Sequence, residues 1–184
     1  MALPKNLNDQ DLIRLCREGD SECFSELYMR YHKMIFNSIL RLVVDFAQAE
    51  DLLQEVFITL YQEIMKGHQI EHFGGFSRRV AINKAIRFLR SSKDMLVLGD
   101  GYQNVADGES QDEEYFEMKV EEVKKAISSL PAGYRTIVNL NIMEGLRHEE
   151  IAELLGVSHT TVRTQYHRAK KKILSLVSKG DYIR

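Results

Sequence analysis

Apolar residues recur every three or four positions along residues 8–90 and again from about residue 113 onward. This spacing places them on one face of an α-helix, whereas a half-buried strand needs strict alternation over several residues. No such alternation and no internal repeat is visible. Only two prolines occur in 184 residues, so little in the chain would break a helix. The sequence therefore predicts an all-α fold.

Charge divides the chain into three blocks. Residues 1–92 are neutral, residues 93–116 carry −6 and residues 117–184 carry +4, which together give the formal charge of −2. The acidic block is rich in turn formers and has no helical period, which is typical of a linker. Because phosphate neutralisation dominates DNA affinity, a chain so balanced should bind duplex DNA weakly by itself. We expect two small helical domains, residues 8–92 and 113–179, joined by a flexible acidic linker, residues 93–112.

Capping residues predict where the first four helices begin. Asn8 or Asp9 can cap the first and Ser21 the second, because short polar side chains accept hydrogen bonds from the free N–H groups of a first turn. Asp45 is expected to begin the third helix. A polar, histidine-containing loop, Lys66 to Gly75, is expected to follow, and the fourth helix is expected over residues 76–90.

The most specific local pattern is a helix-turn-helix over residues 148–167, within a second domain of four helices. Ala152 is small at the fifth position of this pattern, where the two helices cross closely. Gly156 stands at the ninth position, where the turn requires a left-handed backbone. Val162, at the fifteenth, would pack the second helix onto the first, and Ser158 can cap that second helix.

The second helix of this motif carries polar and basic side chains that suit duplex DNA. Arginine reaches guanine edges or phosphates, and threonine meets a thymine methyl or a phosphate. The alternative is a helical hairpin with a solvated basic face, which the three agreeing positions disfavour. The candidate DNA-contacting residues are Ser158, His159, Thr160, Thr161, Arg163, Thr164, His167, Arg168 and Lys171.

A second pattern is an acidic row within the expected third helix. Asp51, Gln54, Glu55 and Ile58 are spaced three or four apart, so they share one face. An acidic and amide row beside an apolar residue suits docking on a basic protein surface. From composition alone, a merely solvated face explains the row better.

A third pattern joins basic and aromatic residues over residues 73–90. Such a combination suits single-stranded DNA, whose bases stack on aromatic rings while its phosphates pair with cations. The aromatic side chains fit a hydrophobic core equally well, so both interpretations stay open. The polar residues on this segment are Arg79, Asn83, Lys84, Arg87 and Arg90, and the aromatic ones are Phe73, Phe76 and Phe88.

Nothing in the sequence predicts catalysis. The run from His148 begins like the zinc-protease pattern HExxH, but Ala152 stands where the second histidine is required. Phosphate-binding glycine loops and the GxSxG nucleophile pattern are missing. We expect no enzymatic activity, no metal site and no cofactor.

No apolar run approaches the roughly 18 residues of a membrane-spanning helix, and no signal peptide is visible, so we expect a cytoplasmic protein without membrane insertion.

Taken in order, three segments resemble a bacterial RNA polymerase sigma factor of the extracytoplasmic-function (ECF) group. They are Ala49–Phe57, with the run AEDLLQEVF, Leu130–Arg135, with LPAGYR, and Glu149–Ser158, with EEIAELLGVS. The resemblance covers nearly the whole chain. Residues 10–90 resemble sigma region 2 and residues 117–177 resemble region 4, with no region 3 domain between them.

The resemblance implies partners and roles. Core RNA polymerase would bind through the clamp helices of its largest subunit and through its flap, and Asp51, Gln54, Glu55 and Ile58 would dock on the clamp helices. The helix that starts at His159 would read the promoter's minus-35 element, and the linker would thread toward the RNA exit path. An anti-sigma factor is a further expected partner. The residues expected to capture and open the minus-10 element are Lys66, His68, Phe73, Phe76, Arg79, Asn83, Lys84, Arg87 and Arg90.

The chain departs from the family pattern at two of these positions. Phe76 stands where tryptophan is usual, and Arg87 where aspartate is usual. Phenylalanine keeps a surface for stacking or packing, and arginine adds positive charge.

Two other function classes remain to be compared: a helix-turn-helix regulator that works without polymerase, and an interaction protein of the anti-sigma type. The acidic row argues against the first, and the helix-turn-helix argues against the second.

Overall fold

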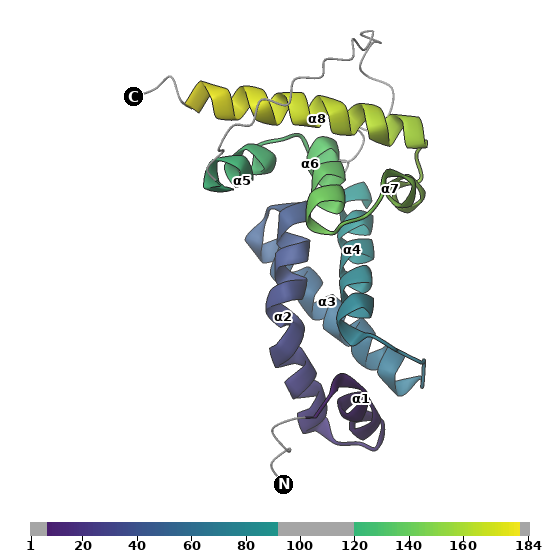
Figure 1. Cartoon of the computed structure of the whole chain (residues 1–184). Coiled ribbons are helices and arrows are strands. Elements are labelled where there is room, and N and C mark those ends of the chain that lie inside the picture. Colours follow the sequence, from purple (N-terminus) through teal and green to yellow (C-terminus); the bar gives the residue numbers. More distant parts are fainter. Residues whose placement is uncertain (1–6, 92–119, 181–184) are drawn as a thin grey trace. The chain divides into compact units, whose positions relative to one another are not determined.

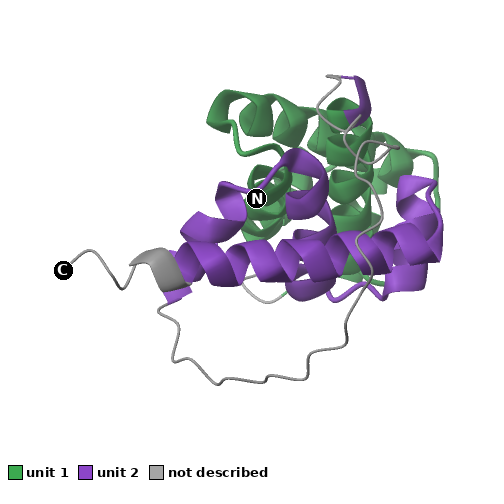
Figure 2. Ribbon diagram, turned by 90° about the horizontal axis from the view of Figure 1, so that it is seen from above, with its two compact units in different colours: residues 1–89 green, residues 90–184 purple. Residues whose placement is uncertain are grey.

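A computed structural model describes residues 7–91 and 120–180, and these ranges contain helices and short connections but no strand (Figure 1). The predicted all-α class is thereby confirmed. The chain divides into two compact units, residues 1–89 and 90–184 (Figure 2). The expected acidic linker, residues 93–112, lies outside the described residues.

The first unit is built on a long helical pair, α2 (Ser21–Val43) and α3 (Phe46–Met65), with α1 (Asp9–Arg17) packed against both. α4 (Phe73–Ser91) contributes its buried face to the same unit. The apolar periodicity predicted these faces, and burial of such residues is the main stabilising term of the unit. Its fully buried side chains include Leu12, Leu27, Ile35, Ile39, Leu42, Leu60, Ile64, Phe73, Ile86 and Leu89.

The caps of the first and third helices are as predicted. The side chain of Asn8 accepts a hydrogen bond from the backbone N–H of Asp11, and that of Asp45 accepts one from Gln48. The prediction for the second helix was wrong by one residue. Asp20 is the cap, because its carboxylate reaches the N–H of Glu22 at 2.9 Å, and Ser21 is the first helical residue.

α4 begins three residues earlier than predicted, at Phe73 instead of Phe76. The Phe73 ring is fully buried against Tyr31 of α2, with ring centroids 5.2 Å apart. A Cβ at Gly74 would lie 2.9 Å from the Tyr31 ring, so this glycine allows the first turn of α4 to approach α2. The glycine that appeared to belong to a loop therefore serves close packing inside a helix.

The second unit holds α5 (Val120–Ser128), α6 (Ala132–Val138), α7 (His148–Leu155) and α8 (His159–Gly180). α8 packs against the other three. A single π-helical turn, η2 (Asn139–Met143), continues α6, a departure from regular geometry that the sequence did not predict. One hydrophobic cluster in the core of this unit comprises Ala126, Ile127, Leu130, Val138, Ala169, Ile173 and Val177.

The helix-turn-helix has the geometry that the sequence predicted. Gly156 ends α7 with a left-handed backbone at φ +65°. Ala152 and Val162 are both buried. The Oγ of Ser158 accepts a hydrogen bond of 3.0 Å from the backbone N–H of Thr161, which caps α8. α7 and α8 therefore pack against each other, with the turn and the buried positions that the sequence predicted.

Candidate functional site

The predicted acidic row lies on the outer face of α3. Asp51, Gln54, Glu55 and Ile58 are all exposed, while the opposite face of the helix is buried in the first unit. Ile58 is a large apolar side chain, and it is 58% exposed. We call these four residues the α3 row. Two exposed carboxylates and an amide beside an exposed apolar side chain can accept a basic protein surface that also offers an apolar contact.

Lys84 of α4 lies at the edge of the α3 row. Its Nζ is 3.1 Å from Oε2 of Glu55, so the two form an ion pair between helices. The sequence assigned Glu55 to protein docking and Lys84 to DNA. Tertiary structure thus brings together one residue from each predicted surface.

The loop between α3 and α4, residues 66–72, is organised around Glu63. One carboxylate oxygen of Glu63 accepts a hydrogen bond of 2.8 Å from Lys66 Nζ, and the other accepts one from His68 Nδ1. These bonds hold the pKa of Glu63 below its usual value, and the bond from Lys66 has the largest effect. Gly67 lies between the two donors with φ +80°, a left-handed conformation that favours glycine. Lys66 and His68, both predicted to face DNA, are thus tied to one acid.

α1 also holds this loop, through hydrogen bonds from two of its side chains. Arg17 donates from Nε to the carbonyl of Ile64 at 2.9 Å and from Nη2 to that of His68 at 2.7 Å. Gln10 donates from its amide nitrogen to the carbonyls of Ile70 and Glu71 at 2.6 and 2.8 Å. Sequence reasoning missed Arg17, Gln10 and Glu63. For Arg17 and Gln10 no local signal exists, because their partners lie 47 to 61 residues away.

A depression of about 580 Å³ lies where α1, α2 and the start of α4 meet. The hydroxyl of Tyr31 donates to Asp9 at its edge. Burial, and then this hydrogen bond to a carboxylate, raise the pKa of Tyr31 to about 12. The depression is lined by Asn8, Asp9, Gln10, Tyr31, Glu71, His72, Phe73, Gly74 and Gly75.

The predicted DNA-facing residues of α4 are in different environments. Arg79, Arg87 and Arg90 are exposed, and Phe76 and Asn83 are half-buried. Phe73 belongs to the core, since its side chain is 0% exposed and packs on Tyr31. Its ring is therefore not at the surface, and the core interpretation of this aromatic is the one that the structure supports.

The outer face of α8 gathers the other predicted set. Ser158, His159, Thr160, Arg163, His167 and Lys171 are exposed, while Thr161, Thr164 and Arg168 are half-buried. His159 Nε2 lies 3.3 Å from Oε1 of Glu149 at the start of α7. Its ring also lies near that of His148, with centroids 6.2 Å apart. Polar side chains thus link the first turn of α7 to the first turn of α8.

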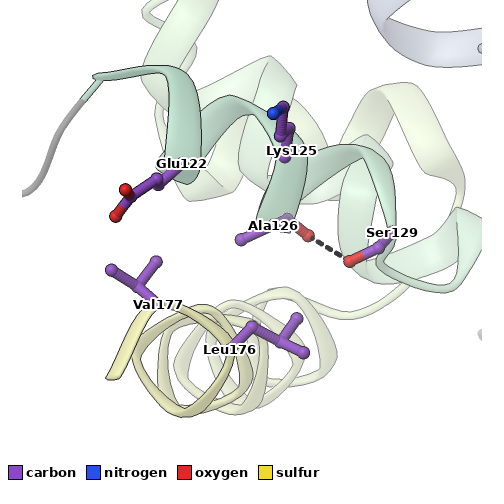
Figure 3. A pocket seen from close by; sticks show the side chains of 6 residues that line it. All are labelled: Glu122, Lys125, Ala126, Ser129, Leu176 and Val177. Carbon is purple, nitrogen blue, oxygen red and sulfur yellow. Dashed lines mark hydrogen bonds between the residues drawn. The ribbon is translucent and has the colours of Figure 1, made fainter. Parts of the chain in front are cut away.

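A separate groove of about 310 Å³ runs between α5 and the C-terminal part of α8 (Figure 3). Apolar side chains of Ala126, Leu176 and Val177 line it together with Glu122 and Lys125, while Ser129 Oγ donates to the carbonyl of Ala126 at 2.8 Å. None of the predicted site residues lines it. The lining residues are Glu122, Lys125, Ala126, Ser129, Leu176 and Val177.

Two features are absent from residues 7–91 and 120–180. In these ranges, no cluster of three or more His, Cys, Asp or Glu side chains is arranged to hold a metal ion. Likewise, none of their helices combines the length and apolar character needed to cross a membrane.

Comparison with known proteins gives concordant matches. Family models described as "Sigma-70 region 2" and "Sigma-70, region 4" match residues 27–94 and 120–173. The RNA polymerase sigma-H factor of Pseudomonas aeruginosa is 31% identical over 176 residues, which cover 90% of this chain and 91% of that protein. The ECF RNA polymerase sigma factor SigW of Bacillus subtilis is 28% identical over 172 residues, covering 88% and 92%.

A solved structure is similar in fold. The sigma factor RpoE of Bartonella quintana, in complex with the anti-sigma factor NepR, matches 88% of this chain and 98% of its own. The TM-score is 0.53 and the identity 18%. At this level of identity the match speaks for the fold, and it agrees with the helices described above.

Proposed function

This chain belongs to the ECF group of the sigma-70 family of transcription initiation factors, and we propose which of its surfaces engage core RNA polymerase and promoter DNA. Family membership favours the initiation factor over a regulator that acts without polymerase. The chain would supply promoter selectivity and help to open DNA, with no catalysis of its own. It would act in the cytoplasm, where core polymerase and promoters are, and join the nucleoid within the holoenzyme.

The α3 row is the proposed docking surface for core polymerase. The observation that carries this assignment is the exposure of Ile58 on the same face of α3 as Asp51 and Glu55, while the opposite face of the helix is buried. Burying Ile58 against a partner would remove apolar area from water, and Asp51 and Glu55 would select a basic surface. The clamp helices of the largest subunit are the proposed partner of the α3 row. The flap of core polymerase is a second proposed contact of the chain.

Two basic surfaces are the proposed DNA contacts. The minus-10 surface comprises the loop after α3 and the exposed side of α4, where cations stand beside a half-buried Phe76. Single-stranded DNA offers phosphates to the cations and bases for stacking. The minus-35 surface is the N-terminal half of α8, presented for the major groove by the helix-turn-helix. Phe73 is not part of this proposal because it is buried.

An anti-sigma factor is a further proposed partner. The similar sigma factor of Bartonella quintana is seen in complex with one. A partner that covers the α3 row would prevent polymerase from docking there, because both would need the same exposed face.

Charge reversal on the α3 row tests the proposed function. Asp51→Lys combined with Glu55→Lys should abolish retention of the chain on immobilised core polymerase and run-off transcription from a cognate promoter. Circular dichroism should stay unchanged, since both side chains are exposed. Glu22→Lys, an exposed acid at the start of α2, is the control and should retain binding. Holoenzyme formation by the double variant at the wild-type level would refute the assignment of this surface.

A further inference from the structure

The ion pair between Glu55 and Lys84 joins two surfaces that are proposed for different partners. Glu55 belongs to the α3 row, and Lys84 belongs to the minus-10 surface on α4. The atoms Glu55 Oε2 and Lys84 Nζ are 3.1 Å apart, and the residues are separated by 29 positions in sequence. Packing of α3 and α4 therefore creates a contact that neither surface requires by itself.

We propose that this ion pair is exchanged when the chain docks on core polymerase. In the free chain, the Glu55 carboxylate neutralises the Lys84 ammonium. On docking, the carboxylate turns to the basic surface of the polymerase, and the ammonium is released to a phosphate of the opened strand. The inference rests on the proposed function, because it requires Glu55 to face polymerase and Lys84 to face DNA.

The exposure of the two side chains fits an exchange. The Glu55 side chain is 59% exposed, so a partner can reach the carboxylate without unfolding anything. The Lys84 side chain is only 25% exposed, so most of its stem is covered by protein while its head is held at Glu55. A lysine ammonium is a mobile point charge on a flexible stem, and it can change partner by rotating terminal torsions.

The expected strength of the ion pair between Glu55 and Lys84 also fits an exchange on docking. An ion pair with this much solvent access shifts an equilibrium by up to about fivefold, because water and salt screen it and ordering two side chains costs entropy. Such a pair is strong enough to weaken DNA binding by the free chain. It is weak enough for a docked polymerase to replace it.

Release of Lys84 would add a positive charge next to another cation on α4. Arg87 follows three positions later on α4, which places it on the same side of the helix, and it is exposed. Freeing Lys84 would therefore enlarge a cationic surface to which Arg87 already contributes an exposed guanidinium. Polymerase binding and strand capture would be coupled through a single carboxylate.

Salt dependence of the free chain is the first test. The probe is a short single-stranded oligonucleotide of mixed sequence at low salt. Glu55→Gln should steepen the slope of log K against log[salt] by about 0.7, the value for one added phosphate contact on a single strand. Glu50→Gln removes the same charge from α3 without releasing a lysine and should leave the slope unchanged. Equal effects of the two variants would show general electrostatics and overturn the exchange.

The same Lys84 substitution in two states is the second test. Lys84→Gln should leave the slope of the free chain unchanged, because the ammonium is already neutralised there. In the holoenzyme, with the same oligonucleotide, it should reduce the slope by about 0.7. An identical effect in both states, or none in either, would overturn the proposal.

Affinity for core polymerase supplies a test of opposite sign. If Glu55 must leave Lys84 to dock, Lys84→Gln should tighten core binding by up to about fivefold. If Lys84 instead holds Glu55 in its docking geometry, the variant should weaken binding, and the exchange is wrong. Failure of the proposed function is recognised separately, because core binding would then resist the charge reversal at Asp51 and Glu55.

Discussion

Arg17 of α1 is joined to His68 in the loop after α3, across 51 residues of sequence: Arg17 Nη2 donates to the His68 carbonyl at 2.7 Å. The Nε of the same guanidinium donates to the carbonyl of Ile64 at 2.9 Å, at the end of α3. One side chain thus satisfies the last turn of a helix and the loop that follows it. The loop proposed to meet the minus-10 element is held in place before any DNA arrives.

Loss of this clamp should destabilise the first unit. Arg17→Ala removes two hydrogen bonds from a charged donor, and we expect a loss of about 1–2 kcal/mol in the free energy of unfolding. Urea unfolding followed by circular dichroism measures it. Arg14→Ala is the matched control on the same helix, since Arg14 is largely exposed and makes only a 3.7 Å ion pair with Asp11, and it should cost less than about 0.5 kcal/mol. Equal losses for both variants would contradict a specific clamp.

Two adjacent glycines should respond in opposite directions to alanine. A Cβ at Gly74 would meet the Tyr31 ring at 2.9 Å, so Gly74→Ala should destabilise by about 1–3 kcal/mol. A Cβ at Gly75 would meet nothing within 4 Å, and Gly75→Ala should stabilise by about 0.5–1 kcal/mol because alanine favours helix. Thermal unfolding of the two variants checks the pair. A stabilising Gly74→Ala would mean that α4 does not begin with this close approach.

Arg163 separates base reading from phosphate contact on α8. If it makes a bidentate base contact, Arg163→Ala should cost the holoenzyme about 1–3 kcal/mol and relax preference at one minus-35 base pair. If it contacts phosphate, binding should weaken evenly across sequences, and the salt slope should fall by about one. A holoenzyme binding series with single base-pair changes distinguishes the two. Lys170→Ala, exposed and outside the predicted set, should leave sequence preference intact.

Arg79 and Asn83 should act on strand opening. Both lie on α4 within the proposed minus-10 surface, so Arg79→Ala or Asn83→Ala should impair opening more than closed-complex binding. Permanganate reactivity of unpaired thymines, measured beside a footprint of the closed complex, separates the steps. Lys33→Ala, an exposed residue of α2, serves as control. If the Arg163 variant bound normally but failed to open DNA while the Asn83 variant did the reverse, the two surfaces would be assigned the wrong way round.

Acid should release the loop through Glu63. Hydrogen bonds from Lys66 and His68 lower the folded-state pKa of Glu63 below its unfolded value of about 4.3. These bonds therefore contribute stability above that pH, and the contribution is lost as pH falls through the folded pKa. Amide chemical shifts of Gly67 and His68 should move in that window in wild type and stay flat in Glu63→Gln. A transition of the same size in Glu63→Gln would assign it to another group.

Much of the architecture was predictable because its signals are local. The cap at Asn8, the cap at Asp45 and the cap at Ser158 each act on a backbone N–H three residues away, so residue type and spacing suffice. Gly156 and Val162 likewise act inside one short motif. The α3 row was predictable as a set because four residues at helical spacing must share a face.

What tertiary structure decided involves partners that lie far apart in sequence. From the sequence, the Phe73 ring could stack on DNA or belong to a core. Its packing on Tyr31, which lies 42 residues earlier, makes it a core residue. α4 accordingly begins at Phe73, three residues earlier than predicted. The sequence also determined that Glu55 and Lys84 carry opposite charges, but not that they meet. A helix repeats every 3.6 residues whatever surrounds it, so its faces can be deduced from the chain. Which face meets which depends on how several helices pack together, and no local spacing contains that information.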